Sequence, residues 1–273
     1  MRETGLNGIF YDVKGSGERT IVLLRGLARW SDHWLGFEKF LADKGFRVIT
    51  VDNRGFGKSS DAESSKNLTV HDLADDVAQV ISKEAPGGAH VVGLSLGAMI
   101  GLALAAMKPQ LVRSLMMVNS SVGGSKIPRI SKRALFSILQ IAVMGRRGYD
   151  PLSRVILSPE SPNSKREKLS KSWSEIDREH RVSLRRLFSQ LRAARGFQGF
   201  VEMASIKCPV TIVRCDQDKF VDPRNSDFIH RQIPSAEIVK HPTAGHELAV
   251  DDPDWFVDVI ISALNRAEST KNS

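Results

Sequence analysis

The pentapeptide Gly93-Leu94-Ser95-Leu96-Gly97 constrains the fold more than any other segment, because it joins two apolar runs of different period. The run before it, Ala89-His90-Val91-Val92, is short and β-branched and predicts a buried strand. The run after it, residues 98–107, is long and rich in Ala and Leu and predicts a helix that ends at Lys108-Pro109. A serine flanked by glycines at a strand-to-helix turn is typical of a nucleophile elbow. Ser95 is therefore the candidate nucleophile.

An acyl-transfer serine needs a general base and a carboxylate that orients the base, and both follow Ser95 in the sequence. A predicted strand, residues 209–213, precedes a loop that contains Asp218. A second predicted strand, residues 237–240, precedes the loop that contains His246. Because the carboxyl ends of parallel strands meet at one edge of a sheet, we expect the three side chains to converge there.

Other residues compete for two of these roles. Asp216 and Asp222 flank Asp218 in the same loop, and His241 precedes His246 by five residues. Asp216 is expected to cap the turn, since loop aspartates commonly do so. Because His246 follows a glycine after the last predicted strand, it is preferred as the base.

Five segments in order resemble the α/β-hydrolase superfamily, more closely its capped esterases and lipase-like members, over residues 8–266. They are Leu24-Arg25-Gly26-Leu27, Asp52-Asn53-Arg54-Gly55-Phe56-Gly57-Lys58-Ser59, the Ser95 elbow, the Asp218 loop and Gly245-His246. The resemblance implies an α/β fold with a mostly parallel sheet flanked by helices. It also implies a core over residues 1–122 and 206–273 and a helical cap over residues 123–205.

The same resemblance implies a chemistry. Ser95 would attack a carboxylic ester, His246 would transfer the proton, and Asp218 would orient His246. The backbone amides of Leu27 and Leu96 would hold the oxyanion of the tetrahedral intermediate. No cofactor is implied, and water would release the acyl group. Carbon–carbon bond hydrolases and other acyl-transfer enzymes share such a triad, and a ligand receptor that retains the pocket is the alternative outside enzymes.

Arg25 is a departure from the superfamily pattern, which usually has histidine before this glycine. The donor that matters is a backbone amide, so the change need not abolish function. We consider two interpretations: a permanent cation near the entrance of the site that alters substrate choice or loop geometry, or simple drift at a position outside the site.

A basic insert interrupts the alternating pattern between residues 123 and 205. It holds 17 lysines and arginines against 7 acidic residues, a net charge of +10, while the whole chain carries +8. Four apolar residues there have helical spacing and predict one buried stripe: Leu184, Leu187, Phe188 and Leu191. Four arginines are expected on an adjoining arc of the same helix: Arg178, Arg181, Arg185 and Arg192. An earlier apolar segment, residues 134–144, is expected to line an acyl pocket.

Two interpretations of this charge remain open. A charge run usually forms a solvated face, but a cationic cap beside a catalytic site would also concentrate an acidic substrate, carrier protein or anionic lipid. Pimeloyl-acyl-carrier-protein methyl ester esterases, whose cap arginines hold an acidic carrier protein, resemble this chain in size and cap position. That resemblance implies a carrier-bound methyl ester of biotin synthesis as the substrate. Nucleic acid is not expected, because few aromatic residues accompany the charges.

Composition and spacing restrict the remaining possibilities. No apolar run approaches the roughly 18 residues of a membrane span, and residues 1–5 lack the apolar core of a secretion signal. Cys208 and Cys215 flank one predicted strand, too far apart for a disulfide, so two thiols in a reducing cytoplasm are expected. Neither a phosphate-binding loop nor metal-ligand spacing is present, so no metal is expected.

At the start of the chain, residues 9–13 and 20–24 predict an antiparallel hairpin.

Overall fold

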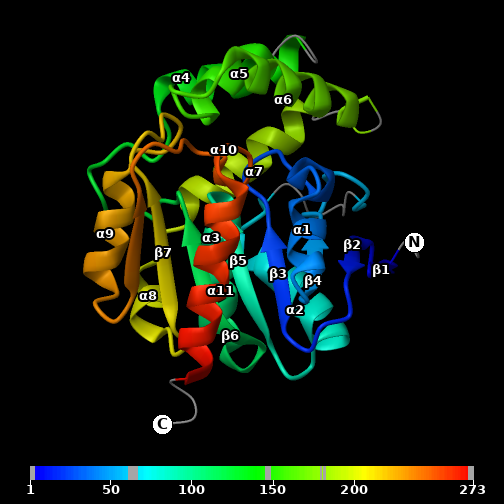
Figure 1. Cartoon of the computed structure of the whole chain (residues 1–273), viewed down its shortest axis with the longest axis vertical. Helices are drawn as coiled ribbons and strands as arrows, with labels where there is room; N and C mark the ends of the chain where they lie inside the picture. The colour runs from blue at the N-terminus through cyan, green and yellow to red at the C-terminus, as the bar shows by residue number, and fades with distance from the viewer. Residues whose placement is uncertain (1–3, 61–66, 145–148, 179, 181–182, 270–273) are drawn as a thin grey trace.

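One twisted sheet forms the centre of the molecule (Figure 1). The computed structural model describes residues 4–60, 67–144, 149–178, 180 and 183–269. Its described strands form an eight-stranded sheet in the order β1-β2-β4-β3-β5-β6-β7-β8. They are β1 (Thr4–Leu6), β2 (Ile9–Lys14), β3 (Thr20–Leu24), β4 (Arg47–Val51), β5 (Ala89–Leu94), β6 (Val112–Val118), β7 (Val210–Cys215) and β8 (Glu237–His241). The strands from β4 to β8 pair in parallel, which confirms the predicted α/β class.

Helices cover both faces of this sheet. The core helices are η1 (Ser31–Trp34), α1 (Phe37–Asp43), α2 (Val70–Glu84), α3 (Leu96–Met107), η3 (Pro109–Leu111), α8 (Phe200–Ser205), α9 (Arg224–Gln232), α10 (Leu248–Asp251) and α11 (Pro253–Ser269). The side chains of α1 and α11 pack with one face of the strands, and those of α2, α3 and α9 pack with the other. Within the described residues, no helix combines the length and the apolar character that crossing a bilayer requires.

The predicted opening hairpin is wrong. β2 pairs antiparallel with β4, while β3 lies between β4 and β5 and pairs in parallel with both. Every residue of β3 is buried, which suits a central strand, whereas β2 is only partly buried. The connection between β2 and β3 crosses closely over the start of β4. A Cβ atom at Gly17 would lie 1.8 Å from the carbonyl oxygen of Gly45, so only glycine fits that crossing.

The remaining helices lie between β6 and β7 in the sequence. They are α4 (Lys132–Met144), α5 (Tyr149–Ile156), α6 (Asn163–Ile176) and α7 (Leu184–Gly196). In Figure 1, α4, α5 and α6 form a layer across one end of the sheet, and α7 runs from that layer towards the core. The segment ends in α8, which contacts α3 and α9 beside the sheet. This layer therefore covers the end of the sheet at which the predicted site residues are expected.

The predicted apolar stripe of α7 is only half correct. Leu187 is fully buried and Leu191 is partly buried, but Leu184 and Phe188 are exposed. The reason is that α7 buries a polar residue on its inner face: Gln190 is 0% exposed and its Oε1 accepts a hydrogen bond from the amide of Ala28 at 2.9 Å. The inner face of α7 is thus rotated towards this contact with the core.

Candidate active site

Ser95 occupies a sharp turn between β5 and α3. Its backbone has φ 56° and ψ −114°, a conformation that is strained for a residue with a side chain. The turn closes because the flanking glycines leave room: a Cβ at Gly93 would lie 2.4 Å from the backbone of Gly97, and a Cβ at Gly97 would lie 2.2 Å from the Leu24 carbonyl oxygen. These contacts explain the glycines on both sides of the serine.

His246 and Asp218 lie in contact, although 28 residues separate them. The Nδ1 atom of His246 is 2.7 Å from Oδ2 of Asp218, and both side chains are buried. The other carboxylate oxygen, Oδ1, accepts hydrogen bonds from the amides of Phe220 at 2.7 Å and Val221 at 2.9 Å. The Phe220 ring stacks on the imidazole with centroids 4.5 Å apart. The imidazole is therefore held on one edge and one face. Among the described residues, its Nε2 atom makes no hydrogen bond.

Ser95 is close to the same cavity but not bonded to His246. A Cβ at Gly26 would lie 3.3 Å from the Ser95 Cβ, so Ser95 packs directly against Gly26. Gly26 and His246 both line one small cavity, whose volume is about 20 Å³. Among the described residues, the Ser95 hydroxyl has no hydrogen bond to His246. Hydrogen bonds of this kind often form only in the complex with substrate.

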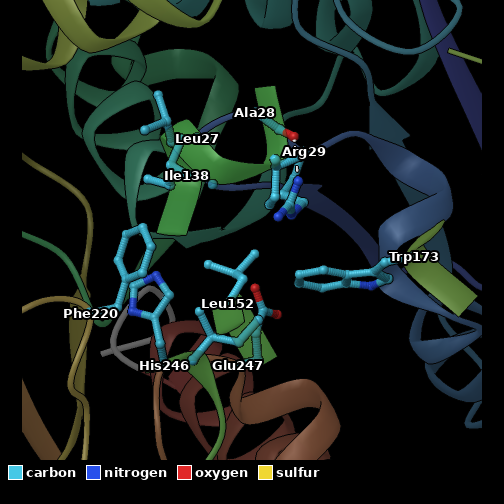
Figure 2. A pocket seen from close by; sticks show the side chains of 12 residues that line it. Leu27, Ala28, Arg29, Ile138, Leu152, Trp173, Phe220, His246 and Glu247 are labelled. Carbon is cyan, nitrogen blue, oxygen red and sulfur yellow. Dashed lines mark hydrogen bonds between the residues drawn. The ribbon is translucent and has the colours of Figure 1, made fainter. Parts of the chain in front are cut away.

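The cavity is mostly apolar, and residues between 123 and 205 form part of its lining. Besides Gly26, Leu27 and His246, its lining comprises Ala28, Arg29, Ile138, Ile141, Leu152, Ile156, Trp173, Phe220 and Glu247. Ile138 and Ile141 belong to α4, in the segment that was expected to line a pocket. Figure 2 shows His246 and Phe220 on one side of the cavity and Trp173 on the other.

Two backbone amides are available for an oxyanion. Leu27 lines the cavity and Leu96 is the first residue of α3, where helical amides have no partner within the helix. Within the described part of the chain, neither amide donates a hydrogen bond. The loop that carries Leu27 is fixed on both sides, by the Arg29 amide bonding to the Gly26 carbonyl at 3.3 Å and by the Ala28–Gln190 contact.

Asn119, directly after β6, holds the loop of His246 and was missed by the sequence analysis. Its Nδ2 donates to the carbonyl oxygens of Gly245 at 3.2 Å and His246 at 3.1 Å, and its Oδ1 accepts from the amide of Cys215 at 2.9 Å. It joins the ends of β6 and β7 to the loop beyond β8. No local pattern marks an asparagine for this role, because its three partners lie on segments far apart in the chain.

Arg25 lies inside the protein and not at the entrance of the cavity, which corrects the first interpretation. It is 2% exposed and forms two hydrogen bonds with Glu247, Nη1 to Oε2 at 3.1 Å and Nη2 to Oε1 at 2.9 Å. Its guanidinium also lies over the Trp34 ring, 4.6 Å from the centroid. Burial lowers the pKa of Arg25, and Glu247 opposes this shift. Arg25 therefore joins the loop before Leu27 to the residue after His246.

The competing residues are bound elsewhere. Asp216 pairs with Arg214 at 2.7 Å, and Asp222 pairs with Arg224 at 2.6 Å. The Nε2 atom of His241 lies 3.2 Å from Asp252. None of these three lines the cavity that His246 lines.

The four cap arginines do not share one helix, contrary to expectation. Arg178 follows the end of α6, because Ser183 caps α7 by accepting a hydrogen bond from the Arg186 amide, and α7 begins only at Leu184. Arg181 lies outside the described residues. Arg178, Arg185 and Arg192 are exposed, and none of them lines the cavity near His246.

The two cysteines, Cys208 and Cys215, do not form a disulfide. Burial raises the pKa of the Cys215 thiol, which keeps it protonated and unreactive. In the part of the chain that the structure describes, no group of three or more histidine, cysteine or acidic residues could hold a metal ion.

Comparisons with known proteins agree with this geometry. Residues 19–253 match the family model described as alpha/beta hydrolase fold. A relative from Agrobacterium fabrum, named "Putative carbamate hydrolase RutD", is 26% identical over 254 residues, which cover 92% of this chain and 95% of that protein.

Solved structures show the same fold. The esterase EaEST from Exiguobacterium antarcticum superposes with a TM-score of 0.81 at 18% identity, over 94% of this chain and 95% of that one. The enol-lactonase from Burkholderia xenovorans LB400 superposes with a TM-score of 0.78 at 19% identity, over 97% of this chain and 100% of that one. The chain belongs to the alpha/beta hydrolase family and is a hydrolase of that fold.

Proposed function

We propose that the protein is a serine carboxylic-ester hydrolase that works through an acyl-enzyme intermediate. The Ser95 hydroxyl attacks the ester carbonyl, and its proton passes to Nε2 of His246. The amides of Leu27 and Leu96 hold the oxyanion that forms on the carbonyl oxygen. Collapse of this intermediate expels the alcohol, which takes the proton from His246. A water molecule, deprotonated by His246, then attacks the acyl-enzyme and restores Ser95 as the acid product leaves.

The contact between His246 and Asp218 carries this proposal. With Nδ1–H donating to the carboxylate at 2.7 Å, the proton is held on Nδ1, and Nε2 keeps the lone pair that a general base needs. Asp218 cannot rotate away, because two backbone amides hold its other oxygen. Ser95 packs against Gly26, which lines the same cavity as the imidazole. Residues of α4, α5 and α6 line this cavity, which supports a role of residues 123–205 as a lid that excludes water.

The test is hydrolysis of p-nitrophenyl acyl esters of increasing chain length by the wild type and by Ser95→Ala. We expect turnover by the wild type and loss of at least about 1,000-fold in kcat for the variant, as for removal of other serine nucleophiles. A fluorophosphonate should add covalently to the wild type and not to the variant, detected by mass spectrometry. Ligand binding without turnover of any ester, and without labelling, would favour the alternative of a non-catalytic receptor.

The carrier-bound methyl ester remains a narrower form of this proposal. Its support is the net positive charge of residues 123–205 and the exposure of Arg178 and Arg185. If an acidic carrier protein docks there, replacement of both by Glu should lower kcat/KM on a methyl-ester acyl carrier protein at low salt and leave a p-nitrophenyl ester unaffected. Equal activity of variant and wild type on the carrier substrate would discard it.

A further inference from the structure

Arg29 places a buried positive charge in the wall of the cavity. Its side chain comes from the loop that carries Leu27, and the residue is only 6% exposed. Figure 2 shows the guanidinium directed into the space between Leu152 and Trp173, on the side of the cavity opposite His246 and Phe220. A buried arginine is costly unless its charge and its N–H groups are compensated.

The described residues compensate Arg29 only in part. Its Nη1 donates to the Ala28 carbonyl oxygen at 2.9 Å and to the Tyr149 hydroxyl at 3.4 Å. The guanidinium also lies over the Trp173 ring, 4.3 Å from the centroid, and over the Tyr149 ring at 5.2 Å. In the part of the chain that the structure describes, no carboxylate forms an ion pair with Arg29. Among the described residues, only its Nη1 atom therefore has hydrogen-bond acceptors.

The two carboxylates nearby are already bound to other groups. Glu247 lines the cavity but forms its two-point ion pair with Arg25. Asp177 accepts a hydrogen bond from the Tyr149 hydroxyl and lies 3.6 Å from Nε2 of His33. Burial lowers the pKa of His33 and raises that of Tyr149, so both are neutral. Among the described residues Asp177 therefore forms no hydrogen bond with Arg29, although the two opposite charges attract each other across the short distance that Tyr149 spans.

We propose that Arg29 determines substrate specificity by binding a carboxylate on the substrate, so that the preferred esters are monoesters of short dicarboxylic acids. This inference rests on the proposed ester hydrolysis. The planar guanidinium matches a carboxylate at two points, and Trp173 fixes its plane from one face. Because Arg29, Leu27 and His246 line the same cavity, the carboxylate would bind in the cavity that holds the reacting carbonyl.

The experiment compares a neutral ester, p-nitrophenyl butyrate, with the anionic mono-p-nitrophenyl esters of succinate, glutarate and adipate. We expect Arg29→Gln to lower kcat/KM for the best anionic ester roughly 10- to 100-fold, as for loss of a charged hydrogen bond. The neutral ester should be hydrolysed within about threefold of the wild-type rate, an allowance for small changes in packing. Arg29→Lys should restore part of the anionic activity. Equal losses on neutral and anionic esters would overturn the proposal, because they would indicate a purely structural role.

A charge-matched control separates local binding from the overall charge. Arg154 lies on the outer side of α5, and its side chain is 63% exposed, so Arg154→Gln removes the same charge without touching the cavity. We expect this control to keep the wild-type preference between the two ester classes. A loss of preference equal to that of Arg29→Gln would contradict binding at Arg29.

A binding measurement keeps the proposal testable without turnover. By titration calorimetry on the wild type, glutarate should bind at least about tenfold more tightly than its neutral diamide, glutaramide, and Arg29→Gln should abolish the difference. Equal binding of the two compounds would overturn the proposal even if Arg29→Gln failed to fold. If no ester is hydrolysed but glutarate binds through Arg29, ester hydrolysis fails as the function while the carboxylate site stands.

Discussion

Arg25 and Glu247 form a buried two-point ion pair between residues 222 positions apart in the chain. Glu247 directly follows His246, and its amide donates to the Ile156 carbonyl oxygen of the cap at 3.0 Å. Arg25 precedes Gly26, against which Ser95 packs. The ion pair therefore connects the loop of the expected oxyanion donor to the loop of the expected base. The Glu247 amide connects the second loop to Ile156 of α5.

This pair predicts an asymmetric response to substitution. Arg25→Met leaves the Glu247 charge buried without a partner and should lower the free energy of unfolding by about 3–5 kcal/mol. The double variant Arg25→Met/Glu247→Met removes both charges and should be considerably more stable than the single variant. Urea unfolding of the wild type, the two single variants Arg25→Met and Glu247→Met, and the double variant measures this. Additive losses in the double variant would contradict a coupled ion pair.

Asp218 and Asp216 provide a matched test of the acid assignment. Asp218→Asn replaces the acceptor of the His246 proton and favours the wrong tautomer, so kcat for an ester should fall by about 10³- to 10⁴-fold with little change in KM. Asp216→Asn alters a carboxylate bound to Arg214 and should retain near wild-type kcat. Steady-state kinetics decide between them, and a larger loss in the Asp216 variant would reverse the assignment.

Asn119 is expected to act on catalysis through the position of His246. Asn119→Ala removes three hydrogen bonds around the loop, and kcat should fall roughly tenfold or more while KM changes little. Asn225 offers a control, since it is also fully buried and its amide bonds to the carbonyl oxygens of Pro128 and Asp222, away from the histidine loop. If both variants lose stability but keep the same kcat, Asn119 has no positioning role.

Gly97 is expected to tolerate no side chain. A Cβ there would lie 2.2 Å from the Leu24 carbonyl oxygen, so Gly97→Ala must displace β3 or α3 and should cost at least about 1–3 kcal/mol of stability. Nothing lies within 4 Å of a Cβ at Gly196, the last residue of α7. Gly196→Ala should therefore leave stability unchanged or raise it by about 0.5 kcal/mol. Thermal unfolding compares the Gly97→Ala and Gly196→Ala variants. Similar melting temperatures would contradict the close approach of Gly97 to Leu24.

His90 predicts a loss of stability in mild acid. Burial lowers its pKa from 6.5 to about 4, with Glu268 opposing the shift. Between these two pH values the unfolded chain binds a proton that the folded chain does not, so the free energy of unfolding falls as pH falls below 6.5. From pH 7 to pH 5 this contribution amounts to about 2 kcal/mol. Urea unfolding of His90→Gln should show a pH dependence weaker by that amount, and identical pH dependence in both proteins would refute it.

Much of the fold and the candidate site was readable from the sequence, because the signals are local. The apolar periods on either side of Ser95, the glycines that its turn requires and the acidic and histidine loops after predicted strands each depend on a few neighbouring residues. Their order along the chain then predicted an α/β fold with the parallel strands β3 to β8, and it predicted that His246 would meet Asp218.

The incorrect predictions concern which distant segments of the chain contact one another. β2 has the sequence of a strand, but nothing in residues 9–14 indicates that β4 and not β3 will be its neighbour. The spacing of the arginines between 178 and 192 is consistent with one face of a single helix. In the structure, however, Ser183 caps a new helix within that span. Local spacing predicts an element but not what the element contacts.

The elements, the elbow and the order of the candidate triad follow from backbone geometry and side-chain type over short stretches of the chain. The burial of Arg25 against Glu247, the support of the histidine loop by Asn119 and the position of Arg29 in the cavity wall depend on how distant segments pack. The physical reason is that the energy of a buried charge or amide depends on the groups packed around it, and here those groups come from segments far apart in the chain.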